Sequence, residues 1–200
     1  MILSLMCATA LQSATAAEFF PTVPGTVRTY SGKGSNGLMI NTVGKPLDAG
    51  GSSIIPITGS FGAGGGQATY YKVDQNIVSI YAYDPKHPLP VPMPLFEIGT
   101  GKVNWDFQGK TATGPNVERL LAHGEAHLAG QRNVLGKRVD VLIVDMRVAL
   151  GIGVSGETIE QHVVYGRGIG MVEMTTKTRL GNNKKVDETT YTLSSVGTSE

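Results

Sequence analysis

The sequence contains little cysteine and almost no excess charge. Its single cysteine is Cys7. If the first 17 residues are removed on export, the remaining chain has no cysteine, which excludes disulfide bonds and thiol catalysis. Seventeen Lys and Arg residues balance sixteen Asp and Glu residues, giving a net charge of +1. Such a chain has no long-range field to attract nucleic acid or an anionic membrane, so no nucleic-acid partner is expected.

The N-terminus has no charged residue. Residues 1–17, MILSLMCATALQSATAA, are apolar in their first part and end in small residues. This pattern predicts a signal peptide cleaved after Ala16 or Ala17, and hence a periplasmic or secreted protein. The run is too short and too interrupted to cross a bilayer, and the residues before Cys7 do not match a lipidation site. Residues 18–200 are long enough for a single β-rich domain.

Glycine is abundant, at 27 of 200 residues, while charged residues make up only 16%. From Phe19 onward, apolar and polar residues alternate between Gly, Pro and Asn clusters, which is typical of half-buried strands. We therefore expect a mainly β fold, a strongly curved antiparallel sheet or half-open barrel of about ten strands with at most one or two short helices. The predicted strands are Gly25–Tyr30, Leu38–Val43, Gln67–Val73, Ile77–Tyr83, Lys102–Gln108, Glu125–Ala129, Lys137–Ala149, Glu157–Tyr165, Gly170–Arg179 and Glu188–Val196.

Three other segments have less regular patterns. Asn116–His123 places apolar residues on one helical face after Pro115, although it could equally begin a strand. Gly44–Ser53 and Gly59–Gly66 are glycine-rich and are interpreted as loops, either plain connections or a functional lid.

Proline occupies every second position from 88 to 94 in the stretch PKHPLPVPMPLF. Because proline has no N–H, one edge of this segment cannot pair in a sheet. We expect an extended strap that covers a sheet edge. A polyproline ligand for a partner domain is the alternative, but the apolar residues repeat every two positions rather than every three. The side chains expected to pack inward are Leu89, Val91, Met93 and Leu95.

Two glycine clusters have spacings that suggest a nucleotide site. Gly151–Gly156 matches G-x-G-x-x-G, but the β-branched segment after it is a predicted strand and not the helix that a dinucleotide fold requires. A hairpin turn explains it better. Gly166, Gly168 and Gly170 also lie between two predicted strands, where glycine usually permits a bulge or a bend with positive φ. Arg167, between them, is an exposed turn residue or an anion ligand.

His123, Glu125 and His127 are the metal-ligand candidates, because on a strand these side chains point to one face and all can bind zinc. A polar, solvent-facing strand edge is the simpler interpretation. His87 and His162 are isolated and are expected at the surface.

No catalytic arrangement is recognisable. No serine stands in G-x-S-x-G, and Glu157 and Glu160 are expected on opposite faces of one strand. We therefore expect a protein that is not an enzyme, with no catalytic, cofactor-binding or metal-binding residues.

Two motifs carry a resemblance. Phe20-Pro21, Gly25 and Tyr30 form F-P-x3-G-x4-Y, and residues 165–172 form Y-x2-G-x-G-x-V through Tyr165, Gly168, Gly170 and Val172. The pair resembles a group of poorly characterised exported bacterial β-rich proteins, some of them lipoproteins, with a fold like the lipoprotein-localisation carriers. Arg28 stands where that group often has an aromatic residue, and a lipidation cysteine is missing.

The resemblance implies a bent sheet whose concave apolar face holds a lipid or acyl chain, or is filled by its own side chains. It supplies no catalytic residues. Five aromatic residues are candidates for that interior, with ordinary core packing as the alternative: Tyr71, Tyr81, Tyr83, Trp105 and Phe107.

Three functions follow as hypotheses. The first is an exported, non-enzymatic binding or carrier-like module for an apolar ligand, such as a lipid, or for an envelope partner. The second is a structural or interaction protein of the envelope without a small ligand, docking through its proline strap and sheet edges. The third is a metal-dependent enzyme using His123, Glu125 and His127.

Overall fold

The computed structural model describes residues 14–33, 37–62, 66–111, 119–151, 156–181 and 186–199. Most of the predicted signal peptide, with Cys7, lies outside these ranges. So do Gly153 within the G-x-G-x-x-G match and residues 116–118 of the helix candidate.

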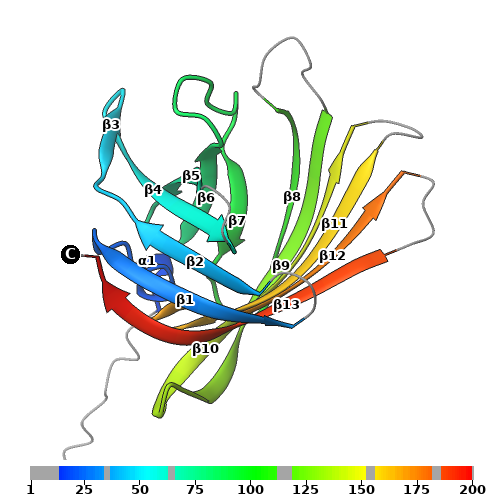
Figure 1. Ribbon diagram of the computed structural model, residues 1–200. Helices are drawn as coiled ribbons and strands as arrows, with labels where there is room; N and C mark the ends of the chain where they lie inside the picture. Colours follow the sequence, from blue (N-terminus) through cyan, green and yellow to red (C-terminus); the bar gives the residue numbers. More distant parts are fainter. Residues whose placement is uncertain are drawn as a thin grey trace, which may run out of the picture.

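The described residues form one short helix and a single mainly antiparallel sheet, as the sequence predicted (Figure 1). The helix is α1 (Ala16–Phe19). The strands are β1 (Thr26–Lys33), β2 (Leu38–Val43), β3 (Leu47–Ala49), β4 (Ser52–Phe61), β5 (Gln67–Val73), β6 (Ile77–Ala82), β7 (Met93–Glu97), β8 (Val103–Lys110), β9 (Arg119–Val134), β10 (Lys137–Leu150), β11 (Glu157–Gly166), β12 (Gly170–Leu180) and β13 (Val186–Thr198).

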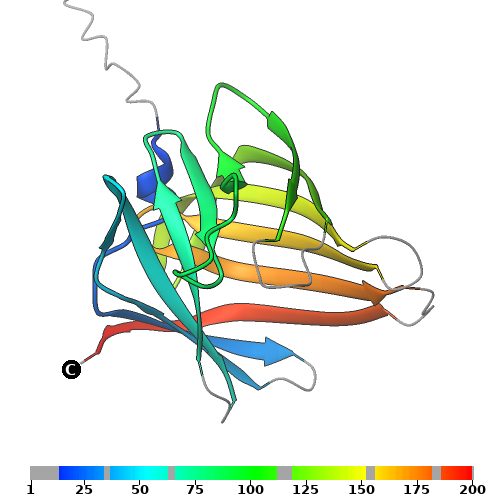
Figure 2. The same cartoon turned by 90° about the horizontal axis from the view of Figure 1, so that it is seen from above.

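The sheet curls into a half-open barrel. Its order is β7-β6-β5-β4-β2-β1-β13-β12-β11-β10-β9-β8, with β3 paired to β4. Figures 1 and 2 show β4 to β7 forming one wall and the long strands β9 to β13 the other, across a common interior. The two ends of the order, β7 and β8, approach each other in space. The concave face of the sheet therefore surrounds the interior on most sides.

Register shifts in the strand ladders provide the curvature. They occur at Thr29/Tyr30 in β1, Asp140/Leu142 in β10 and Val164/Tyr165 in β11, and also in β5 and β6. A bulge bends a strand and increases its local twist. These shifts therefore help to bend the sheet, whose curvature Figure 1 shows.

The described residues form thirteen strands, where about ten were predicted. The missed strands are β3, β4 and β7. The first two fall within the expected glycine-rich loops or between them, and the third lies in the proline strap. Of the two alternatives for Asn116–His123, the described part follows the strand and not the helix, since residues 119–123 begin β9 and pair with both β8 and β10. Here cross-strand pairing outweighs a weak helical pattern.

The proline segment covers the edge of the sheet, as predicted. β7 pairs with β6, and the Leu89 N–H donates to the Tyr81 carbonyl oxygen at 2.9 Å. Leu89, Met93 and Leu95 are buried. Val91 is an exception, because it is 58% exposed and lies in the bend before β7.

The apolar core lies on the concave side. Its main cluster joins β6 and β7 to β9, β10 and β11 through residues such as Val78, Phe96, Leu120 and Val144. A second cluster surrounds Tyr30, Val141, Val164 and Tyr191. α1 contacts β6 and β12 and inserts the buried side chains of Ala16 and Phe19, so it closes one end of the interior. None of the helices in the described ranges is long and apolar enough to span a membrane.

Candidate functional site

The concave side of the sheet encloses a cavity of about 560 Å³. This volume lies within the range of small-molecule sites, roughly 300–1,000 Å³. The cavity is lined from both walls, by Ile57 and Tyr71 on one side and by Val148 and Val163 on the other. The interior is therefore only partly filled by the protein's own side chains.

Methionine is concentrated at this cavity. Every methionine in the described ranges lines it: Met39, Met93, Met146, Met171 and Met174. These residues come from β2, β7, β10 and β12, so they surround the space rather than form one patch. Methionine is unbranched and polarisable, and it adapts its shape to different apolar partners. The lining is suited to an apolar ligand of flexible shape.

An aromatic cluster lies at the end closed by α1. The Phe20 ring lies 5.0 Å from the Tyr71 ring, and the Phe96 ring lies 4.9 Å from the Tyr165 ring, between centroids. The Phe20 and Tyr165 rings are 6.3 Å apart, which joins the two pairs. Burial raises the pKa of both Tyr71 and Tyr165 above the ordinary value, so these phenols stay neutral.

Arg28 and Tyr30 lie on the inner face of β1 near the same end. Arg28 is 6% exposed, and its Nε donates to the Ile169 carbonyl oxygen at 2.7 Å while Nη2 donates to the Pro21 carbonyl oxygen at 3.0 Å. The Tyr30 hydroxyl donates to the Met171 carbonyl oxygen at 3.1 Å. Burial lowers the pKa of the Arg28 guanidinium and raises the pKa of Tyr30 to about 12.

These hydrogen bonds bring the two sequence motifs together. Gly170 lies against the guanidinium, and a Cβ there would be 3.1 Å from Arg28 Nε. Its φ of +95° is also a conformation that side chains disfavour. The bend at Gly168 and Gly170 is thus structural, as the sequence predicted, and it provides space for Arg28. No role for Arg28 was predicted from the sequence, although its position two residues before Tyr30 on a strand places both side chains on one face.

A few polar uncharged side chains also line the cavity. They include Asn41, which pairs with Arg28 across β1 and β2, and Gln161 on β11. Arg28 is the one charged residue among the described residues that line the cavity.

The predicted interior aromatics divide into three groups. Tyr71 and Tyr83 line the cavity, and Trp105 and Phe107 belong to or pack against the main core. Tyr81 lines neither the cavity nor the core clusters, because it is the extra residue of a bulge where Tyr70 pairs with Ala82 and Tyr71 pairs with Ile80.

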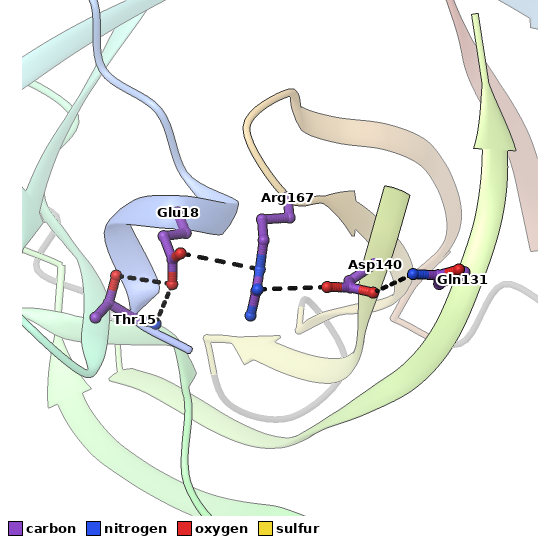
Figure 3. Close-up of polar contacts among 5 residues, drawn as sticks. All are labelled: Thr15, Glu18, Gln131, Asp140 and Arg167. Carbon is purple, nitrogen blue, oxygen red and sulfur yellow. Dashed lines mark hydrogen bonds and ion pairs between the residues drawn. The ribbon is translucent and has the colours of Figure 1, made fainter. Parts of the chain in front are cut away.

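Arg167 links α1 to β10 through its contacts with Glu18 and Asp140 (Figure 3). Its guanidinium lies 3.3 Å from Asp140 and 4.0 Å from Glu18, and 5.5 Å from the centre of the Phe19 ring. Gln131 donates to Asp140, and Glu18 accepts the Thr15 N–H. Two carboxylates of the same chain therefore occupy the position considered for an external anion.

The G-x-G-x-x-G segment also has the predicted antiparallel setting. β10 and β11 pair from Leu150 with Glu157, and Gly151 has a φ of +75°. A dinucleotide site needs a parallel β/α crossover at this point, and these flanking strands form a hairpin instead.

The metal candidates share the outer face of β9, but they have no partner in common, and His127 Nδ1 is buried with no hydrogen-bond partner among the described residues. His123 Nδ1 contacts Asp106 at 2.8 Å, and Glu125 pairs with Lys102 at 2.8 Å. Within the described ranges, no three His, Cys, Asp or Glu side chains gather to hold a metal ion. His162 contacts Asp145 at 2.7 Å, and His87 contacts Asp84 at 2.8 Å. Both histidines are substantially exposed, as predicted, and each contacts one aspartate.

Comparison with known proteins gives two solved structures. One is a candidate lipoprotein from Parabacteroides distasonis, with a TM-score of 0.48 and 12% identity over 93% of this chain and 100% of that chain. The other is a candidate exported protein with a YmcC-like fold from Bacteroides fragilis, with a TM-score of 0.44 and 11% identity over 90% of this chain and 98% of that chain. Both similarities are distant.

No family model matches the chain. No curated protein matches it either. The resemblance to carrier-like exported proteins stays a prediction from the motifs.

Proposed function

We propose that this protein is an exported, non-enzymatic binding module that holds an apolar ligand in its concave cavity. The observation that carries the proposal is the cavity of about 560 Å³ between the two walls of the sheet, with five methionines around it. A core packed for stability alone fills such a space, because empty volume costs dispersion contacts. A cavity that stays unfilled and has an adaptable methionine lining therefore supports ligand binding.

Export is proposed on the sequence of residues 1–17. In the periplasm or outside the cell, a soluble protein can shield a lipid or acyl chain from water. Removing apolar surface from water provides the affinity, at about 25 cal/mol per Å² before the cost of association.

The test uses the neutral fluorophore N-phenyl-1-naphthylamine and the purified protein. We expect saturable binding with a strong rise in fluorescence, and lipid released on denaturation of protein purified from its host and detected by mass spectrometry. Met146→Trp places a larger side chain in the cavity and should reduce binding at least about tenfold by filling the site.

Arg147→Trp is the matched control. Arg147 is adjacent in β10, but its side chain is 67% exposed on the outer face, so binding should not change. Wild-type protein that neither binds the fluorophore nor releases lipid would refute the proposal, as would equal binding by folded Met146→Trp.

A further inference from the structure

The buried cation at one end of the cavity has only neutral partners in the described structure. A guanidinium has five N–H donors, and the Arg28 guanidinium donates to the carbonyl oxygens of Pro21 and Ile169. None of the ion pairs among the described residues includes Arg28. Burial of a charge is costly unless it is paired, so this position favours an anion.

The contrast with Arg167 supports this interpretation. Arg167 is half-exposed and has two carboxylate partners, Glu18 and Asp140. Arg28 is far more buried and has no carboxylate partner among the described residues. The chain therefore neutralises the more exposed arginine and leaves a positive charge facing the cavity.

The surroundings of Arg28 suit a carboxylate. Asn41 lies directly opposite on β2 and also lines the cavity, so it can offer an amide donor beside the guanidinium. Gly170 keeps the space against the guanidinium clear of a side chain. A guanidinium fork binds a carboxylate through two parallel hydrogen bonds.

The remainder of the cavity suits a long apolar tail. From Tyr165 near Arg28 to Ile159, the lining residues of β11 cover roughly 20 Å of strand, at about 3.3 Å per residue. Along this path lie Met171, Met174 and Met146, together with the uncharged side chain of Gln161. The site has one cationic end and a mainly apolar body.

We propose that the ligand is a long-chain carboxylate of the fatty-acid class, with its head group paired to Arg28 and its chain extended toward Leu150 and Ile159. The inference deepens the proposed function and rests on it. If Arg28 only ties Pro21 to Ile169, the cavity should not distinguish head groups.

The test compares dodecanoate with dodecanol, which share the same alkyl chain, by displacement of N-phenyl-1-naphthylamine. Wild-type protein should bind dodecanoate at least about tenfold more tightly, as expected for a charge-assisted pair. Arg28→Gln should lower this preference at least about tenfold, because it should weaken dodecanoate binding much more than dodecanol binding. Arg147→Gln, on the outer face, is the control and should retain the preference.

Arg28→Gln also removes two structural hydrogen bonds and could therefore fail to fold. Two measurements do not depend on that variant: the ratio of dodecanoate affinity to dodecanol affinity in wild-type protein, and the same ratio in Arg28→Lys. Arg28→Lys keeps the charge and should retain part of the preference. Equal or tighter binding of dodecanol by wild-type protein overturns the inference but leaves the proposed function intact. If neither compound nor the fluorophore binds, the proposed function itself fails.

Discussion

Trp105 packs over Gly124, the residue directly opposite it on the neighbouring strand. The pair joins β8 to β9, and a Cβ on Gly124 would overlap the indole ring. The indole is 7% exposed and belongs to the main core. Glycine at this position therefore allows a large aromatic side chain to lie against the backbone. The spacing of glycines in the sequence does not predict this packing role.

We predict that Gly124→Ala lowers the free energy of unfolding by about 1–3 kcal/mol, because the new methyl group displaces the indole. Urea denaturation followed by tryptophan fluorescence measures it. Gly197→Ala is the matched control, since Gly197 lies in a strand, has no positive φ, and has no atom within 4 Å of the place that a Cβ would take. Equal stability of the two variants would contradict this packing account.

At the residue scale, strand alternation predicted several inner side chains but not their roles. Alternation puts Arg28 and Tyr30 on one face of a strand, yet nothing in the local sequence shows that Arg28 is buried beside Gly170, 142 positions further along the chain. Tyr81 was a candidate for the interior, while Phe20, Phe96 and Tyr165 form the aromatic cluster. Which aromatic rings meet depends on curvature, which no single strand encodes.

Among the elements, the proline-rich segment shows how a strand can form without full pairing. β7 lies at the edge of the sheet, where proline's missing N–H is tolerated. Its ladder with β6 shifts register between Val78 and Ser79, and Pro94 lies opposite Ser79. The segment was predicted as a strap over an edge, and the structure adds that it becomes the edge strand itself.

We predict that Met93→Ala destabilises the fold by about 2–5 kcal/mol, toward the lower end because Met93 borders the cavity and its loss can be partly absorbed. Val91→Ala, in the exposed bend of the same segment, should change stability by less than about 0.5 kcal/mol. Thermal or urea denaturation of both variants provides the measurement. A larger effect at Val91 would mean that this residue packs inward, as the sequence pattern alone suggested.

β4 was missed because proline and glycine obscured it. Pro56 lies where the partner of β4 changes, since Ile57 pairs with β2 while Ile54 pairs with β3. On the side of β4 that faces β2 and β3, the Pro56 carbonyl oxygen accepts the Gly44 N–H at 2.8 Å. A proline is compatible with an interior strand at such a junction because no ladder hydrogen bond from its nitrogen is required there.

Across the whole molecule, neutral tyrosines are buried inside the curled sheet. Tyr30, Tyr71 and Tyr165 all have a raised pKa, with burial as the largest cause. An acid whose pKa is higher in the folded state binds more protons there than in the unfolded state at alkaline pH. Its contribution to stability is complete below the unfolded value, near 10 for tyrosine, and is lost as the pH rises.

We therefore predict that the free energy of unfolding falls between pH 10 and about 12, by up to about 1.4 kcal/mol per pH unit for each such tyrosine. Tyr30→Phe should show a shallower fall, because one of these groups is removed. Urea titrations at a series of pH values test this. Between pH 6 and 8 the two proteins should have parallel pH dependence, and equal slopes above pH 10 would show that Tyr30 does not contribute.

The class of fold could be predicted from the amino-acid sequence, because alternation, glycine-bounded turns and scarce charge are local properties of each strand. The roles of Gly151, Gly168 and Gly170 in hairpins and bends were equally predictable, since no helix follows them in the required position. The cavity and the environment of Arg28 could not be predicted in this way. Both arise from bulges and from contacts between segments far apart in the chain, and these depend on how the whole sheet closes.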